Sequence, residues 1–158
     1  MKDSMSIKGF FRVQIVDSKT KKVKGDSGWK ENVVTSQGLN YTLGGCAVGR
    51  SDSKQAKYLL LGSASAPNFS HASLSGSVGS FSAFATSDLG TAAASQTARM
   101  TCQFGSGLIV GGSVNISNIG VFPTNSNASM IAGQAFTSSQ WNTNQDVNVT
   151  YELRLASA

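Results

Sequence analysis

The alternation of apolar and polar positions is clearest near the C-terminal end of the chain. Between Val147 and Leu155 every second side chain is apolar, and the positions between them carry Asn, Thr, Glu and Arg. A repeat of two is typical of a β-strand with one face in a core and the other in water. Such a strand needs neighbours in a sheet and a second apolar layer against its buried face.

Shorter patterns of the same kind recur along the chain, separated by turn-forming residues. They predict further strands at residues 10–16, 21–24, 29–35, 56–61, 80–86, 96–104, 114–122 and 129–136. The run from Tyr58 to Leu61 is apolar throughout, which predicts a strand covered on both faces. Residues 87–95 are interpreted as a turn region, and residues 137–145 as a polar loop that carries Trp141.

One segment predicts a helix. Thr35 or Ser36 can cap a short helix that runs through Leu43, and Gly44-Gly45 is expected to end it. In this helix Leu39 and Leu43 lie on the same face, because they are four residues apart.

These elements predict an all-β fold. About eight short strands at this spacing, with one helix near residues 36–44, favour a jelly-roll-like β-sandwich that forms a single domain over residues 1–158. Two further features are a basic N-terminal hairpin at residues 8–25 and a long Ser/Ala/Gly-rich arm at residues 62–79. Leu74 is the one weak apolar anchor expected for that arm.

Charge is sparse and unevenly distributed. Only 13% of the residues are charged and the net charge is +5. Residues 1–57 hold eleven Lys or Arg and five Asp or Glu, whereas residues 58–158 hold two and three. The basic part is either a solvated hairpin or a contact for an acidic surface of a protein or nucleic acid. Aromatic residues do not interleave with the lysines as single-strand binding requires, so we expect no sequence-specific nucleic-acid partner.

The residues that usually carry chemistry do not form a recognisable set. His71 is the only histidine and is interpreted as a loop residue, and Cys46 and Cys102 are expected to be buried free thiols. Together they do not make a zinc site. The carboxylates of the C-terminal two thirds are isolated from one another, so paired-carboxylate hydrolysis is not indicated. We therefore expect no enzyme, no catalytic or metal site and no cofactor.

Two apolar features are interpreted as surfaces for a partner or as core. The glycine-rich stretch at residues 105–112 is not a dinucleotide loop, because a strand rather than a helix follows it. Its Leu108-Ile109-Val110 tip either docks a partner or forms a small satellite cluster. Trp141 either stacks on a sugar, pins a loop to the core or fills a subunit interface.

Three segments, in this order, resemble a known class of proteins. They are residues 31–39 (Glu-Asn-Val-Val-Thr-Ser-Gln-Gly-Leu), residues 58–67 (Tyr-Leu-Leu-Leu-Gly-Ser-Ala-Ser-Ala-Pro) and Asn118-Ile-Gly-Val-Phe122, followed by Val-Thr-Tyr-Glu-Leu at residues 149–153. This succession resembles virion structural proteins of tailed bacteriophages, which include capsid decoration (cement), neck, tail and fibre proteins. That class commonly has an acidic residue where this chain has Asn118. The resemblance implies a jelly-roll-like β-sandwich, self-association, docking on a virion shell and no catalytic residues.

The leading hypothesis is a capsid decoration protein that binds the major capsid protein on the outer shell, as a homo-oligomer and most simply a trimer. The alternatives are a neck, tail or fibre component and, from another class, a carbohydrate-binding module. With neither a signal peptide nor an apolar run of membrane length in the sequence, we expect synthesis in the host bacterial cytoplasm, a final location in the virion and no membrane partner. The expected interface residues are Phe10, Arg12, Lys19, Lys21, Lys22, Lys24, Leu74, Leu108, Ile109, Val110 and Trp141.

Overall fold

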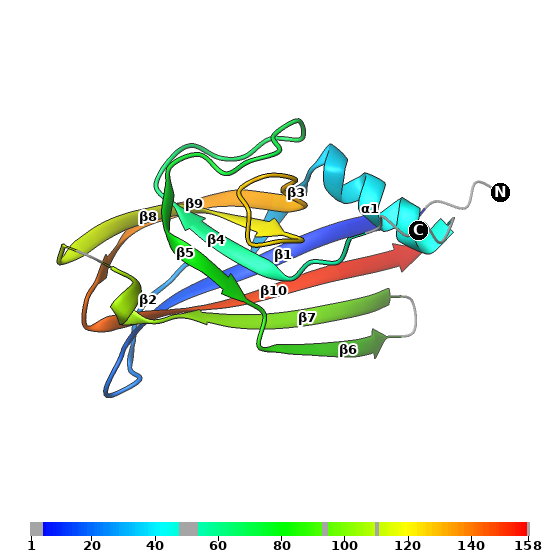
Figure 1. Cartoon of the computed structure of the whole chain (residues 1–158). Helices are drawn as coiled ribbons and strands as arrows, with labels where there is room; N and C mark the ends of the chain where they lie inside the picture. The colour runs from blue at the N-terminus through cyan, green and yellow to red at the C-terminus, as the bar shows by residue number, and fades with distance from the viewer. Residues whose placement is uncertain (1–4, 48–53, 93–94, 110, 158) are drawn as a thin grey trace.

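A computed structural model describes residues 5–47, 54–92, 95–109 and 111–157, which form an antiparallel β fold with one α-helix (Figure 1). Its elements are β1 (Met5–Asp17), β2 (Val23–Asp26), β3 (Lys30–Val34), α1 (Ser36–Ala47), β4 (Tyr58–Gly62), β5 (Ser77–Ala83), β6 (Thr86–Ala92), β7 (Ser95–Phe104), the 3-10 turn η1 (Ser106–Leu108), β8 (Ser113–Phe122), β9 (Ala132–Asn142) and β10 (Gln145–Ser157). The predicted all-β class with one short helix is confirmed, although the described residues form ten strands rather than about eight.

The strands form one nearly closed sheet with the order β5-β4-β8-β9-β3-β1-β10-β7-β6, and β2 pairs with β1 beside β3. The sheet folds into two facing layers at β3, which pairs with β1 through residues 30–32 and with β9 through residues 33–34. One layer holds β1, β10, β7 and β6, and the other holds β9, β8, β4 and β5. The apolar faces of the two layers meet in the core.

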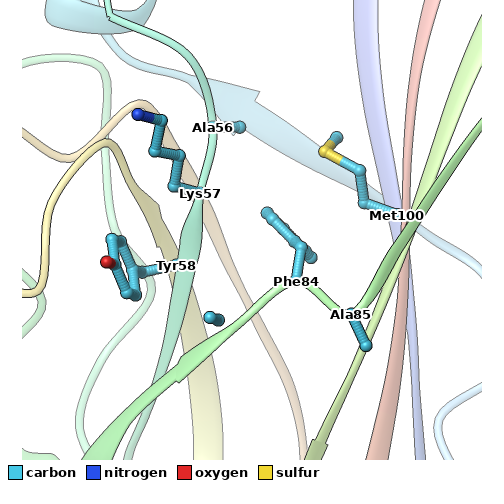
Figure 2. A pocket seen from close by; sticks show the side chains of 7 residues that line it. Ala56, Lys57, Tyr58, Phe84, Ala85 and Met100 are labelled. Carbon is cyan, nitrogen blue, oxygen red and sulfur yellow. The ribbon is translucent and has the colours of Figure 1, made fainter.

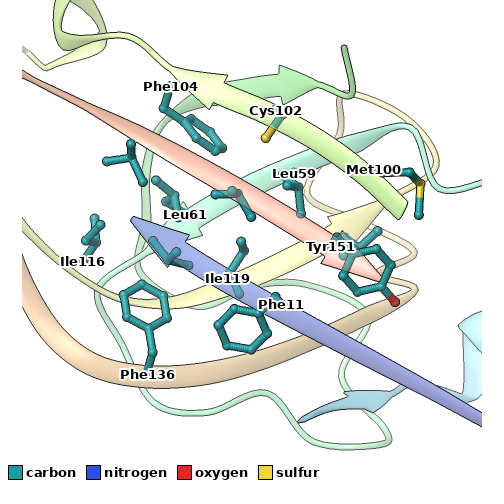
Figure 3. Packing of buried hydrophobic residues seen from close by; sticks show 14 of the residues in the cluster. Phe11, Leu59, Leu61, Met100, Cys102, Phe104, Ile116, Ile119, Phe136 and Tyr151 are labelled. Carbon is teal, nitrogen blue, oxygen red and sulfur yellow. The ribbon is translucent and has the colours of Figure 1, made fainter. Parts of the chain in front are cut away.

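The pairing of β1 with β10 is the centre of the first layer. It runs without a register shift from Met5 opposite Ser157 to Asp17 opposite Gln145. Three of the five predicted inward positions of β10 are confirmed, because Val147, Val149 and Tyr151 are each at most 1% exposed, whereas Leu153 and Leu155 are half-buried. Figure 3 shows how the inward side chains of β1, β7 and β10 meet those of β4 and β8.

The strands β4 and β8 are covered on both faces, as the apolar run at Tyr58–Leu61 predicted. Leu59 and Leu61 point into the main core, whereas Leu60 belongs to a second cluster with Leu74, Phe122 and Met130. Leu74 comes from the arm, which occupies residues 63–76 because residues 77–79 belong to β5. The arm thus lies over the outer face of β4 and β8 as a third layer, instead of projecting from the protein.

Two segments that we expected to be turns or loops are strands. Residues 86–92 form β6, which pairs with β7 from Thr86 opposite Thr101 to Ala92 opposite Ser95. The strand β9 continues through the expected polar loop to Asn142. It does so across a bulge, because Ile116 pairs with Ser139 and Asn118 with Ala135, which leaves two extra residues on β9.

The helix begins where predicted but is longer. The hydroxyl of Thr35 accepts a hydrogen bond from the backbone N–H of Gly38 at 3.1 Å, so Thr35 is the N-cap. Gly44 and Gly45 do not end the helix, which continues to Ala47. The face that packs on the sheet contains Gly38, where an added Cβ would lie 2.1 Å from the carbonyl oxygen of Ile131. Leu43, on the other face, is 52% exposed.

Candidate functional site

The basic residues of the N-terminal hairpin gather in the β1–β2 turn, at the end of the molecule opposite α1 (Figure 1). Asp17 shapes this turn, because its carboxylate accepts hydrogen bonds from the backbone N–H of Lys19 at 3.1 Å and of Thr20 at 2.8 Å. Lys21 has a positive φ of 58°, which reverses the chain. The turn therefore presents several ammonium groups to solvent from a fixed backbone.

Asp146 joins this turn to the glycine-rich loop after β7. Its carboxylate accepts a hydrogen bond from Nζ of Lys21 at 2.9 Å and another from the backbone N–H of Ser106 at 3.1 Å. The residue is only 7% exposed. A single carboxylate thus fixes two surface loops that are far apart in the sequence, and no local pattern around Asp146 could have indicated this role.

The same end carries exposed apolar side chains. Val23 is 48% exposed and Leu108 is 38% exposed, whereas Ile109 packs against the core and Val110 lies outside the described residues. The glycine-rich tip was interpreted either as a docking surface or as a satellite cluster of the core. The exposed Leu108 fits the first interpretation, and Ile109 fits the second. We call the surface formed by Lys19, Lys21, Lys22, Val23, Lys24 and Leu108 the lysine end.

Phe10 and Arg12 lie elsewhere, on the outer face of the β1–β10 layer. The guanidinium of Arg154 lies 4.2 Å from the centre of the Phe10 ring, a cation–π contact. Arg12 donates hydrogen bonds from Nε to both carboxylate oxygens of Asp26 at 3.0 Å. The positive charge of Arg12 is therefore already matched within the protein, as is that of Lys21 in the lysine end by Asp146.

Glu152 is the centre of this outer face and is 2% exposed. It accepts hydrogen bonds from Nε of Arg99 at 2.7 Å and from Nε of Arg154 at 3.0 Å. Burial raises the pKa of its carboxyl, but the hydrogen bonds from the two arginines outweigh burial, so the net pKa is lowered. The three side chains come from the neighbouring strands β7 and β10, and two arginines hold one buried carboxylate on this face.

We expect the stability of the protein to fall in acid. The hydrogen bond from Arg12 lowers the pKa of Asp26 to about 2, and the bond from Lys21 lowers that of Asp146. Because these pKa values are lower in the folded than in the unfolded chain, their stabilisation is present above about pH 4 and is lost as the pH falls through the folded values. Urea unfolding between pH 7 and pH 2 should show a plateau to about pH 5 and then a decline. Stability that is flat to pH 2 would contradict these carboxylate assignments.

Two hollows open where the layers separate near α1. The larger, the α1 groove, has a volume of about 470 Å³. It is lined by Gly38, Tyr41, Thr42, Lys54, Gln55, Ala56, Ala98, Met100, Ile131, Tyr151 and Leu153. The smaller, the β4 hollow, has a volume of about 330 Å³ and shares Ala56 and Met100 with the groove. Figure 2 shows its lining, with the ring of Phe84 between the β4 strand and Met100.

Small side chains account for both hollows. Gly38, Ala56 and Ala98 line the α1 groove, and Ala83 and Ala85 line the β4 hollow. Where facing layers meet through glycine and alanine, less volume is filled than in the main core. This role was not expected from the sequence, because isolated small residues carry no pattern.

Two of the expected interface residues are core residues. Trp141 is 0% exposed and donates its indole N–H to the carbonyl oxygen of Gln145 at 2.8 Å. In this position it pins the β9–β10 hairpin to the core and cannot stack on a sugar. Leu74 is 2% exposed and holds the arm on the sheet. Neither side chain is available to a partner in this conformation.

The described residues contain no group of three His, Cys, Asp or Glu side chains that could hold a metal ion. Cys102 is a free, buried thiol, as expected, and burial raises its pKa to about 12. The side chain of Cys46 lies outside the described residues. His71 lies in the arm, where Nδ1 accepts a hydrogen bond from the backbone N–H of Asn68 at 3.3 Å.

The chain matches no protein-family model, no curated protein and no solved structure. Within the described ranges, no helix is both long and apolar enough to cross a membrane.

Proposed function

We propose that the protein is a non-enzymatic structural protein of a tailed-bacteriophage virion, and that it acts as a capsid decoration protein on the outer shell. The observation that carries the proposal is the lysine end, where several solvent-facing lysines and two exposed apolar side chains are held on loops that Asp146 joins. Such a surface fits an acidic protein surface with apolar points of contact. The three segments that resemble virion structural proteins suggest that this partner is the major capsid protein.

The distribution of charge supports a protein that acts by forming contacts with other proteins. Residues 58–87 and 100–145 contain no Asp, Glu, Lys or Arg, so the arm and the strands β4, β5, β8 and β9 are uncharged. Neutral polar groups cost less to desolvate at an interface than charged groups do. This face suits contacts between copies of the chain, and we include a homotrimer in the proposal.

The mechanism would be thermodynamic linkage. A protein that binds the assembled shell and not its separated subunits stabilises the shell by the free energy of that binding. Added to shells prepared without it, the protein should bind and raise the temperature at which they come apart. Absence of binding to such shells would contradict the proposal, and a place at the neck or tail in electron micrographs would favour the alternative virion role.

The lysine end can be tested with two variants of equal charge. Replacement of Lys19, Lys22 and Lys24 by Gln should weaken binding to shells by roughly tenfold or more, because three solvent-facing cations leave the contact. Lys21 is retained because it holds Asp146. The matched control replaces Lys8, Lys30 and Lys57 by Gln and should bind nearly as the unaltered protein does. Cosedimentation over a range of salt concentrations measures both, and equal losses would show that only net charge matters.

A further inference from the structure

The α1 groove has the dimensions and the lining of a small-molecule site. Its volume of about 470 Å³ lies within the range of roughly 300–1,000 Å³ that such sites occupy. Ile131 and Met100 form its apolar walls, each 9% exposed, together with Leu153 from β10. It opens where the two layers separate, a place where β-barrels and sandwiches often hold ligands.

The polar groups in the groove limit what can occupy it. The hydroxyl of Thr42 donates to the carbonyl oxygen of Gly38 at 2.9 Å, and the hydroxyl of Tyr151 accepts from the amide of Asn32 at 3.4 Å. A peptide backbone in the groove would have to bury its own amide groups with few partners, which is costly. An alkyl chain makes no such demand and fits the apolar walls.

The charged side chains among the described residues that line the groove and the adjoining hollow are lysines. Lys54 lines the groove, and its ammonium lies 5.7 Å from the centre of the Tyr41 ring, which holds the cation beside the opening. Lys57 lines the adjoining β4 hollow, and no acidic side chain is among the described residues that line either hollow. An anionic group beside Lys54 would meet a positive charge with no competing carboxylate among the lining residues.

We propose that the α1 groove binds an amphiphile with an alkyl tail and one anionic head group, of the fatty-acid class. The tail lies against Met100, Ile131 and Leu153, and the carboxylate lies beside the Lys54 ammonium. This site is independent of the lysine end, which is at the opposite end of the molecule.

Three probes with the same tail test the proposal: laurate, dodecanol and dodecyltrimethylammonium, each titrated calorimetrically below its micelle-forming concentration. Laurate should bind, dodecanol should bind roughly two- to fivefold more weakly, and the cationic probe more weakly still, because an exposed lysine contributes modestly to ion pairing. Equal binding of the three probes, or no binding of laurate, would overturn the proposal.

Two variants locate the site. Lys54→Gln should lower the affinity for laurate to that for dodecanol and leave dodecanol unchanged. Ala98→Phe should abolish binding of laurate, because the new ring fills the groove. Lys24→Gln removes one cation at the far end of the molecule and should change nothing. If Ala98→Phe does not fold, Lys54→Gln still decides, since an unchanged laurate-to-dodecanol ratio in that variant would overturn the proposal.

Discussion

Replacement of Asn118 by aspartate is expected to destabilise the protein by about 3–5 kcal/mol. Asn118 is 0% exposed, and its amide nitrogen donates hydrogen bonds to the carbonyl oxygens of Ser65 at 3.0 Å and of Ser75 at 3.2 Å. These two bonds hold both ends of the arm on β8. An aspartate has the same shape but would direct a buried negative charge at two carbonyl oxygens and would donate nothing to them.

The matched control is Asn115→Asp, which makes the same chemical change on the same strand at an exposed position. Urea unfolding of the control should differ from that of the unaltered protein by no more than about 0.5 kcal/mol. In Asn118→Asp, burial should raise the pKa of the introduced carboxyl above its unfolded value, so the penalty relative to the unaltered protein should shrink as the pH falls toward about 4. If both variants lose the same stability, the amide of Asn118 does not hold the arm.

Asn118 also marks a departure from the virion class proposed above, in which an acidic residue is common at this position. The structure gives a physical reason for an amide here, because the arm carbonyls need a donor. Asn127 holds the arm in the same way, since its side chain accepts from the backbone N–H of Leu74 at 2.8 Å and donates to its carbonyl oxygen at 2.9 Å.

Replacement of Trp141 by alanine is expected to cost about 3–5 kcal/mol of stability, the usual range for loss of a large buried aromatic side chain. The ring packs edge-on against Phe104 with centroids 6.2 Å apart, and the change also removes the hydrogen bond to Gln145. Trp29→Ala is the control, because Trp29 is 42% exposed and its loss should cost less than about 1 kcal/mol.

Fluorescence separates the two tryptophans, since the chain has only two. The Trp29→Ala protein retains Trp141, and its emission should be blue-shifted and protected from quenching by iodide. The Trp141→Ala protein retains Trp29, which iodide should quench. If Trp141 instead meets solvent or a glycan, its emission in the Trp29→Ala protein would be quenched by iodide or would shift when sugars are added.

The strands that were predicted correctly are those in which one regular alternation separates core from solvent. In β1 and β10 the register is unbroken, so the period-2 pattern of Val147, Val149 and Tyr151 maps directly onto burial. The strand β6 was missed because its residues are mostly small and polar, and its conformation comes from backbone pairing with β7 rather than from side-chain pattern.

The end of β9 was missed for a different reason. Phe136 and Trp141 are both buried in the main core although they are five residues apart, a spacing that places them on opposite faces of a regular strand. The pairing with β8 is irregular between Ala135 and Ser139, and across this irregularity the strand changes which of its alternate positions face the core, so both side chains point inward. In the sequence alone, where the pairing with β8 is not visible, residues 137–145 have the composition of a polar loop.

In the candidate sites, too, contacts between residues close in the sequence were predictable, and contacts between residues far apart were not. The lysine turn was predicted because its residues adjoin one another, whereas the carboxylate that fixes it comes from Asp146 at the other end of the chain. The arm lies on the sheet through bonds from Asn118 that join residues 53 and 43 positions apart in the sequence. Local pattern contains none of these pairings.

The pairing of Met5 with Ser157 has a practical consequence for the design of fusion proteins. Both ends of the described chain emerge side by side, at the end of the molecule away from the lysine end (Figure 1). A peptide or enzyme fused at either end would therefore extend away from a surface bound through the lysines. A short linker across these neighbouring ends, with new ends cut elsewhere, would also give a circularly permuted carrier that retains the β1–β10 pairing.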